Sequence, residues 1–212
     1  YTPSLACIIG EAIGCNAPAF DLNAACVGVL YCMEVADSFI ASGKAKTVLI
    51  VSAEAMSKLV DWSDRSTCVL FGDGTGAMVV KAGSGRLAGE LSCNPDSHVI
   101  RMPNFEGLNS PYNQTAQEKM SIYMDGGEVY KFAVNAMGRN IEEVCAQAGL
   151  TPADIDWYLP HQANVRIIDA SLKKFKIDKS KVLLNISECG NMSATSVLVL
   201  LDEYAKKGTF KK

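Results

Sequence analysis

The segment that most constrains the fold is a helix with no polar face. Residues 27–42 read VGVLYCMEVADSFIAS, and their apolar side chains point in every direction around a helix until its last turn. A helix that is apolar all round has to be covered on every side, so we expect it in a central layer between two sheets. Gly43 is expected to end it, because glycine readily adopts the left-handed conformation that closes many helices.

The last helical segment of the chain repeats this pattern. When the chain is shifted by 165 residues, Cys26 aligns with Asn191 and Gly43 aligns with Gly208. This weak similarity describes a duplicated α/β unit, in which two central helices bring their first turns together near a pseudo-twofold axis. Under the same offset, the copy of the strand after the first central helix would begin near residue 212, where the sequence stops. The copy of the strand that carries His161 would lie before residue 1, so we expect the sequence to be cut at both ends.

The remaining segments alternate between strand and helix patterns. In the helix over 163–175, Val165, Ile168, Leu172 and Phe175 mark the apolar side. Strands are expected over 18–25, 46–54, 154–160 and 182–187, helices over 127–149 and 193–207, and two short strands around a glycine turn over 66–82. Residues 1–83 are interpreted as part of an N-terminal half that carries Cys26, 84–125 as a surface excursion, and 126–212 as part of a C-terminal half that carries His161 and Asn191.

Composition excludes several classes of function. The chain has 20 basic and 23 acidic side chains, so its formal charge of −3 provides no general attraction for nucleic acid or an anionic membrane. Its longest apolar runs fall well short of the roughly 20 residues that span a bilayer. Eight cysteines without CxxC spacing and only two histidines do not suggest a zinc site. Most of the cysteines are expected to be small buried hydrophobes in a reducing compartment.

Three side chains combine into a candidate catalytic set. Cys26, in DLNAACVGV, precedes the buried helix, where the helix dipole and unpaired N–H groups can lower the pKa of a thiol. His161, in LPHQAN, follows a strand at the sheet edge where open α/β folds place their ligands. Asn191 lies in ECGNMSATSV, before the last helix. Taken singly, Cys26 is better explained as a buried cysteine and Asn191 as a helix N-cap, while His161 is equally well explained as a histidine satisfied at a strand end.

A papain-like protease also uses Cys, His and Asn, but the CGSC[WY] sequence around its nucleophile is absent. The motifs DLNAACVG, FGDGTGA, LPHQAN and CGNMSATSV instead resemble β-ketoacyl-acyl-carrier-protein synthase III, in that family's order and spacing. This family of condensing enzymes starts bacterial type II fatty-acid synthesis. The resemblance covers essentially all 212 residues. It implies a thiolase-like duplicated αβαβα five-layer sandwich, incomplete in this chain, and a cytoplasmic homodimer that neither binds nucleic acid nor inserts into a membrane.

The activity that the resemblance implies is a decarboxylative Claisen condensation. Cys26 would take the acyl group of an acyl-CoA primer, and malonyl-acyl-carrier protein would then lose carbon dioxide and attack the acyl-enzyme. His161 and Asn191 would donate hydrogen bonds to the thioester oxygen as enolate charge develops. Elongating relatives carry a second His where Asn191 stands, which favours the initiating branch or its plant-type relatives. No cofactor is implied, since CoA and phosphopantetheine thioesters are the substrates.

Further roles follow from the resemblance alone. Arg65 matches an arginine that contacts the adenine and phosphate end of CoA, and Gly126 and Asn164 match positions of the pantetheine channel. The residues that match the acyl pocket are Thr2, Phe71 and Met124. Because several relatives have a Phe where Thr2 stands, the usual preference for acetyl primers is in doubt.

A basic patch for the acidic carrier protein is also implied. Its residues are Lys131, Arg166, Lys173 and Lys174. The last three share the solvent side of the helix over 163–175 by spacing alone, so an ordinary solvated helix face is the alternative. Other functions that stay open are a related condensing enzyme, such as a plant-type polyketide synthase or a hydroxymethylglutaryl-CoA synthase, and a silent partner subunit. Such silent partners lose the nucleophilic cysteine, and Cys26 is present.

Overall fold

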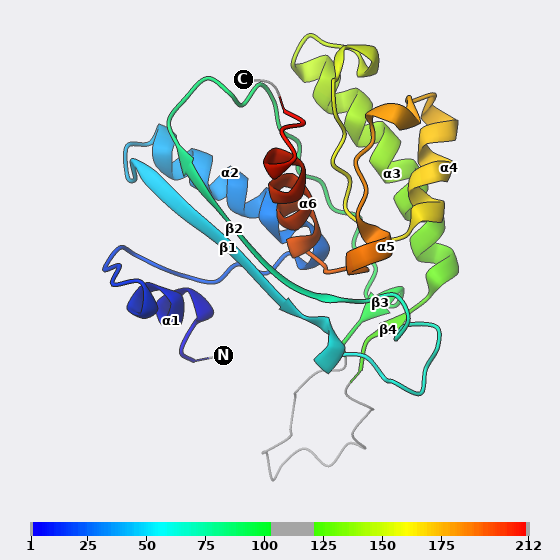
Figure 1. Cartoon of the computed structure of the whole chain (residues 1–212), viewed down its shortest axis with the longest axis horizontal. Coiled ribbons are helices and arrows are strands. Elements are labelled where there is room, and N and C mark those ends of the chain that lie inside the picture. The colour runs from blue at the N-terminus through cyan, green and yellow to red at the C-terminus, as the bar shows by residue number, and fades with distance from the viewer. Residues whose placement is uncertain (1, 103–120, 211–212) are drawn as a thin grey trace.

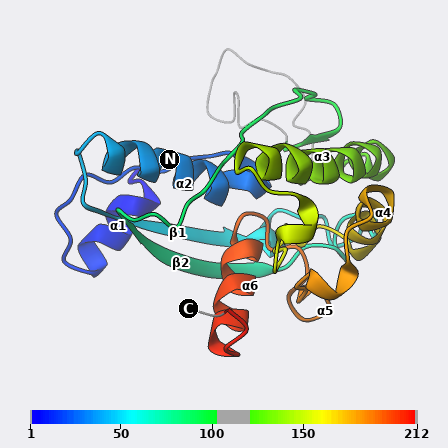
Figure 2. The ribbon, with the colours of Figure 1, turned by 90° about the horizontal axis from the view of Figure 1, so that it is seen from above.

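The computed structural model describes residues 2–102 and 121–210 of the chain. Figures 1 and 2 show two strands with helix α2 running along them and helix α6 crossing them, and with α3, α4 and α5 gathered toward one end of the strands. In chain order the helices are α1 (Leu5–Ala12), α2 (Gly28–Ala41), α3 (Gly126–Gln147), α4 (Val165–Phe175), α5 (Ile186–Cys189) and α6 (Thr195–Lys206), and the strands are β1 (Thr47–Ala55), β2 (Asp73–Lys81), β3 (Ile100–Arg101) and β4 (Tyr123–Met124).

The main sheet is an antiparallel pair. Strands β1 and β2 pair from Thr47 with Lys81 to Ala55 with Asp73, which confirms the strand predicted over 46–54. Figure 1 shows α2 and α6 on one side of these strands and α1 on the other. The core between the strands and the two helices is built on Val29, Ala194 and Leu198, with Met33 and Met78 packed against it.

The glycines of FGDGTGA do not form the predicted turn, because they continue through strand β2. A Cβ atom on Gly74 would lie 2.5 Å from the Met192 sulfur, and one on Gly76 would lie 2.7 Å from the Leu198 Cβ. Real Cβ contacts are longer than this, so only glycine lets the backbone of β2 approach α6 this closely. The prediction of two short strands is therefore wrong, and the glycines mark a close approach instead of a turn.

Helix α2 is less covered than its composition predicts. Only Gly28, Val29 and Ala36 are buried in it, and Leu30 remains 45% exposed. The helix packs on the β1–β2 sheet and beside α6, and no second sheet covers its outer side within the residues that the structure describes. The described residues therefore cover α2 with a sheet on one side only, and the second sheet expected for the complete sandwich is not among them.

Three predicted strands do not form. Residues 18–24 belong to no helix or strand, and Ala25 already begins a helical turn. Asp21, in this segment, instead accepts two backbone hydrogen bonds of 2.8 Å at the start of α1. The segments 154–160 and 182–187 reduce to one parallel bridge, Tyr158 with Val182. A strand needs a neighbour that satisfies its backbone groups over several residues, and sequence patterning does not reveal whether that neighbour is present.

The predicted helices are confirmed. α3, α4 and α6 lie within two or three residues of their expected ranges, and Gly43, Gly149 and Gly208, which follow α2, α3 and α6, have positive φ angles. In α4 the buried apolar residues are Ile167, Ile168 and Leu172, whereas Val165 is 41% exposed. Helix α1 was not predicted, although Ser4 caps it by accepting a hydrogen bond from the Cys7 amide.

Two further predictions concern the cysteines and the surface excursion. All eight cysteines are free, but only Cys145 is buried, and Cys7, Cys15 and Cys93 are exposed, so the expectation that most are buried is wrong. Of the predicted excursion over 84–125, residues 103–120 lie outside the described residues, so it stays a prediction. Among the described residues, no helix is long and apolar enough to cross a membrane.

Helix α4 ends on a lysine in the left-handed conformation. Lys176 has φ 56° and ψ 37°, and its N–H donates to the Leu172 carbonyl. We predict that Lys176→Gly raises the free energy of unfolding by about 1 kcal/mol, because glycine adopts this conformation without the Cβ clash. Urea titration measures the change. Lys176→Ala is the control, since it removes the charge and keeps the Cβ. An equal gain in both variants would assign the effect to charge and contradict the conformational explanation.

Candidate active site

Cys26 lies in a strained turn at the start of α2. It belongs to a single helical turn, Ala25–Val27, and Ala25 has a positive φ of 45°. For a residue other than glycine, a left-handed backbone conformation costs on the order of 1–3 kcal/mol, and such residues are often found at functional sites. The Asn23 side chain stabilises it by accepting a hydrogen bond of 3.1 Å from the Ala25 amide. The turn thus presents Cys26 directly before the helix.

The same local structure recurs at the start of α6. Ser193 has a positive φ of 49°, and the Asn191 Oδ1 accepts a hydrogen bond of 2.9 Å from the Ser193 amide. Asn23 and Asn191 therefore play equivalent roles, and in this register Cys26 corresponds to Ala194. The repeat at the helix starts is offset by 168 residues instead of the predicted 165. The predicted meeting of two helix starts stands, but Cys26 and Asn191 are not equivalent positions in it.

The two helix starts are in contact. A Cβ on Gly28 would lie 3.5 Å from the Ala194 Cβ, and the Ser193 hydroxyl lies near enough to the Cys26 thiol to lower the pKa of that thiol. Asn191 is held from the other side by the segment that directly precedes β2, because its amide donates to the Leu70 carbonyl at 2.9 Å and its carbonyl accepts from the Gly72 amide at 2.9 Å. The structure therefore brings Cys26 and the Asn191 segment together.

Asn191 is oriented by its own hydrogen bond. The residue is only 7% exposed, and its Oδ1 is engaged by the Ser193 amide. The atom that Asn191 can offer to a substrate is then its Nδ2 amino group, which is a hydrogen-bond donor. This matches the donor role expected from the sequence.

The Cys26 thiol does not have the lowered pKa that its position before a helix predicts. Burial is the largest influence and raises the pKa, and the nearby negative charge of Glu54 raises it further. Hydrogen bonds from Ser193 and from the Cys26 backbone act in the opposite direction. The prediction of a thiol activated by helix position alone is wrong, because burial disfavours the thiolate more than these hydrogen bonds favour it.

Glu54 was not predicted as part of the site. It pairs with Gly74 across the sheet, and its carboxylate lies near the Ser193 hydroxyl and the Ala194 amide, which both act to lower its pKa. Burial raises the pKa of Glu54 more strongly than these two groups lower it. The sequence carried one signal that could have located it, namely a charged residue near the end of an apolar strand, opposite a glycine.

His161 lies in the loop between the Tyr158 bridge and α4. Its Nδ1 is buried and has no hydrogen-bond partner in the described part of the chain, and burial lowers the pKa of His161 to about 4. The imidazole is therefore neutral at pH 7 and carries one N–H. A buried N–H without an acceptor is less tolerable than a buried acceptor without a donor, so we place that proton on Nε2. No hydrogen bond joins His161 directly to Cys26 or Asn191 in the described residues.

The other predicted substrate positions are spread around this centre. Phe71 forms a parallel bridge with Asn191, and Met124 is half-buried on β4. Gly126 begins α3 with open space around its Cα, and Asn164 caps α4 by accepting from the Arg166 amide at 2.9 Å. Arg65 and Thr2 are exposed. Only Phe71 is thus brought into contact with the catalytic set, and the roles of all six stay predictions.

The predicted basic patch lies on α3 and α4. Arg166, Lys173 and Lys174 are exposed on α4, as their spacing predicts. The Lys174 amine is hydrogen bonded to Asn135 of α3, and Lys131 of α3 forms an ion pair of 2.6 Å with Glu128. Within the described ranges, no three His, Cys, Asp or Glu side chains are grouped as metal ligands.

Comparison with known proteins decides the family. Residues 20–95 match the family described as 3-oxoacyl-[acyl-carrier-protein (ACP)] synthase III, and residues 145–212 match its C-terminal part. The β-ketoacyl-[acyl-carrier-protein] synthase III of Clostridium tetani is 43% identical over 225 residues, an alignment that covers 100% of this chain and 67% of the relative. The chain belongs to the β-ketoacyl-[acyl-carrier-protein] synthase III family.

Other relatives agree. The synthase III of Clostridium acetobutylicum is 41% identical over 216 residues, covering 100% of this chain and 66% of the relative. The crystal structure of the Thermus thermophilus synthase III has a TM-score of 0.90 at 37% identity, covering 99% of this chain and 66% of that one. The predicted family and its thiolase-like α/β fold are confirmed. The chain spans about two thirds of the length of these relatives.

The depressed pKa of His161 predicts a pH dependence of stability. The unfolded chain takes up a proton near the ordinary pKa of 6.5 and the folded chain only near 4. Between these values the unfolded state binds more protons, so stability falls as the pH is lowered, by up to about 3 kcal/mol. We expect urea titrations at pH 7 and pH 4.5 to show a larger loss in the wild type than in His161→Gln. Equal losses would contradict the buried, neutral histidine.

Proposed function

We propose that this protein catalyses the condensation of an acyl-CoA primer with malonyl-acyl-carrier protein, through an acyl group held on Cys26. The observation that carries the proposal is the contact between the two helix starts, which places Cys26 against Ser193, two residues after Asn191. The proposal is supported by relatives named β-ketoacyl-[acyl-carrier-protein] synthase III that align over the whole of this chain.

The first half-reaction is acyl transfer to sulfur. The Cys26 thiolate attacks the thioester carbon of acyl-CoA, a new S–C bond forms, and the CoA thiolate leaves and takes up a proton. Because burial raises the pKa of the Cys26 thiol, the thiolate is a minor species at pH 7. The Ser193 hydroxyl and the helix start are the groups that favour it.

The second half-reaction requires two hydrogen-bond donors. Malonyl-acyl-carrier protein loses carbon dioxide as its C–C bond breaks, and the electron pair moves onto the thioester oxygen as an enolate. The His161 Nε2–H and the Asn191 Nδ2–H are the donors that stabilise this charge. The enolate carbon then attacks the acyl carbon, and the Cys26 thiolate leaves and is reprotonated.

The remaining contacts belong to the same proposal. Arg65, Gly126 and Asn164 serve CoA and phosphopantetheine, and Thr2, Phe71 and Met124 shape the acyl pocket. The acidic carrier protein docks on Lys131, Arg166, Lys173 and Lys174. The enzyme works as a cytoplasmic homodimer, in which residues 1–83 and 126–212 belong to two halves joined by the excursion over 84–125.

Acylation of Cys26 tests the first half-reaction. We expect acetyl-CoA or a short branched acyl-CoA to add one acyl mass to the protein, expressed at its natural length, and Cys26→Ala to abolish the addition. Intact mass spectrometry measures it. The matched control is Cys32→Ala on the same helix, because burial also raises the pKa of Cys32 and yet no partner links it to Asn191 or Ser193. Acylation that persists without Cys26 would overturn the assignment.

The two donors are tested on malonyl decarboxylation. We expect His161→Ala and Asn191→Ala each to lower its rate by roughly 10²–10³-fold, which is typical for the loss of one donor to an oxyanion. Cys26 acylation is expected to persist in both, since neither donor acts on the thiol. Release of carbon dioxide from malonyl-acyl-carrier protein is the measurement. A variant that blocks acylation as completely as Cys26→Ala would show that the division of labour is wrong.

A further inference from the structure

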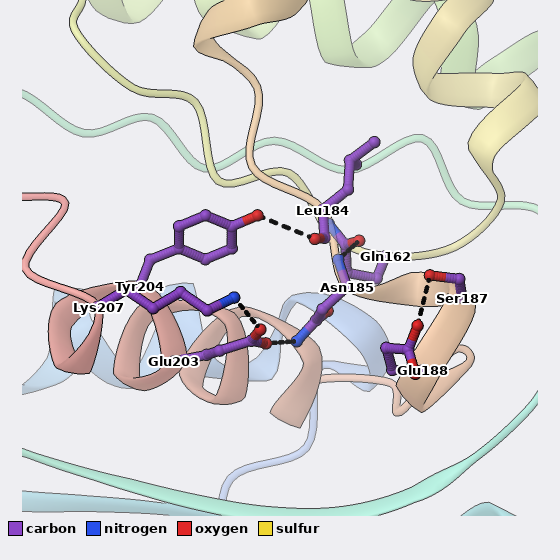
Figure 3. A network of polar contacts seen from close by, with 8 residues as sticks. All are labelled: Gln162, Leu184, Asn185, Ser187, Glu188, Glu203, Tyr204 and Lys207. Atoms are coloured by element: carbon purple, nitrogen blue, oxygen red, sulfur yellow. Dashed lines mark hydrogen bonds and ion pairs between the residues drawn. The ribbon is translucent and has the colours of Figure 1, made fainter.

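A chain of hydrogen bonds runs from α6 to the loop that carries His161 (Figure 3). The Glu203 carboxylate on α6 accepts from the Asn185 Nδ2 at 3.0 Å. The Asn185 backbone amide donates to the Gln162 Oε1 at 3.2 Å, and the Gln162 Nε2 donates to the Pro160 carbonyl at 2.8 Å. We call Glu203, Asn185 and Gln162 the α6–loop network.

The buried members of this network depend on each other. Gln162 is 0% exposed and Asn185 is 3% exposed, and a buried polar group without a partner costs roughly 1–3 kcal/mol. Gln162 directly follows His161, and its side chain donates to the carbonyl of Pro160, which directly precedes His161. The network therefore holds the backbone on both sides of the histidine, and His161 itself has no hydrogen bond at Nδ1 to orient its ring.

Asn185 also belongs to the segment that delivers Asn191. It precedes α5, and its carbonyl accepts from the Glu188 amide at 3.0 Å and the Cys189 amide at 3.1 Å. Two residues after α5 ends, the Asn191 backbone is hydrogen bonded to Leu70 and Gly72, directly before β2. Asn185 is thus shared by the two segments that carry the proposed donors, and its position sets their spacing.

Glu203 is the charged end of the network. Its Oε1 accepts from the Lys207 amine at 2.6 Å, and its side chain is 35% exposed. Hydrogen bonds from Lys207 and Asn185 lower the pKa of Glu203, so it is a carboxylate at neutral pH. A charged acceptor binds the Asn185 amide more strongly than a neutral one, and α6, which carries it, begins only four residues after Asn191.

We propose that Glu203 is a positioning residue, which acts through Asn185 and Gln162 to fix His161 relative to Asn191. The inference rests on the proposed function, because the network is proposed to hold His161 and Asn191 in the positions from which they donate to the substrate. Misplacing a reacting group by about 1 Å can cost on the order of 10²-fold in rate. Decarboxylation needs both donors, whereas acylation of Cys26 does not, so loss of the network should affect the first and spare the second.

The experiment compares these two rates in variants of the protein expressed at its natural length. For Glu203→Ala we expect malonyl decarboxylation to fall by at least about 10-fold, with Cys26 acylation within about 2-fold of the wild type. Glu203→Gln should restore most of the decarboxylation, since its amide oxygen can still accept from Asn185. If Glu203→Ala fails to fold, Glu203→Asp, which shortens the side chain by one methylene, tests the same link with the same expected split.

Tyr204→Phe is the matched control. The Tyr204 hydroxyl donates to the Leu184 carbonyl at 3.2 Å, so the variant removes another bond from α6 to the residue before Asn185 while leaving the network intact (Figure 3). We expect its ratio of decarboxylation to acylation to equal that of the wild type. Equal losses of both rates in Glu203→Ala, or a split as large in Tyr204→Phe, would overturn the positioning role. A wild type that shows neither rate would overturn the proposed function, and the positioning role with it.

Discussion

The site depends on how closely α6 approaches strand β2. Gly72, Gly74 and Gly76 leave no room for side chains, since a Cβ on Gly72 would lie 2.1 Å from the Cys189 carbonyl oxygen and the other two would meet residues of the α6 segment. This approach places Asn191 beside Phe71, in the segment directly before β2, and brings the start of α6 against the start of α2. A side chain on Gly72 would collide with the backbone of Cys189, two residues before Asn191, and one on Gly76 would push against the Leu198 Cβ of α6.

The contact between helix starts is completed by two left-handed residues, Ala25 and Ser193. An asparagine two residues earlier stabilises each of them. The Asn23 side chain accepts a hydrogen bond from the Ala25 amide, and the Asn191 side chain accepts one from the Ser193 amide. In the second half the same asparagine is also a proposed donor to substrate. One side chain therefore holds the backbone turn through Oδ1 and leaves Nδ2 for the reaction, which ties the orientation of the donor to the local fold.

Helices and motifs were predictable from the sequence, whereas sheet pairing was not. The apolar patterns of α3, α4 and α6 are local, and so are the motifs around Cys26, His161 and Asn191. A strand depends on a neighbour distant in the chain, which explains why residues 18–25, with no such neighbour in the described ranges, failed as a predicted strand. Glu54 and the α6–loop network were missed for the same reason, since their roles arise only when segments far apart in sequence are folded together.

The electrostatics of the site favour donors that carry no charge. Burial holds His161 neutral with a pKa of about 4, and the second donor, Asn191, cannot ionise. A fixed positive charge would also stabilise the carboxylate of malonyl before it is lost, and would thereby lower the energy of the ground state as well as of the transition state. Neutral donors oriented in advance act mainly on the charge that develops on the thioester oxygen. The stabilisation that the two donors give the enolate then depends on their orientation more than on charge. The hydrogen bonds that orient the His161 loop and Asn191 therefore set the size of that stabilisation.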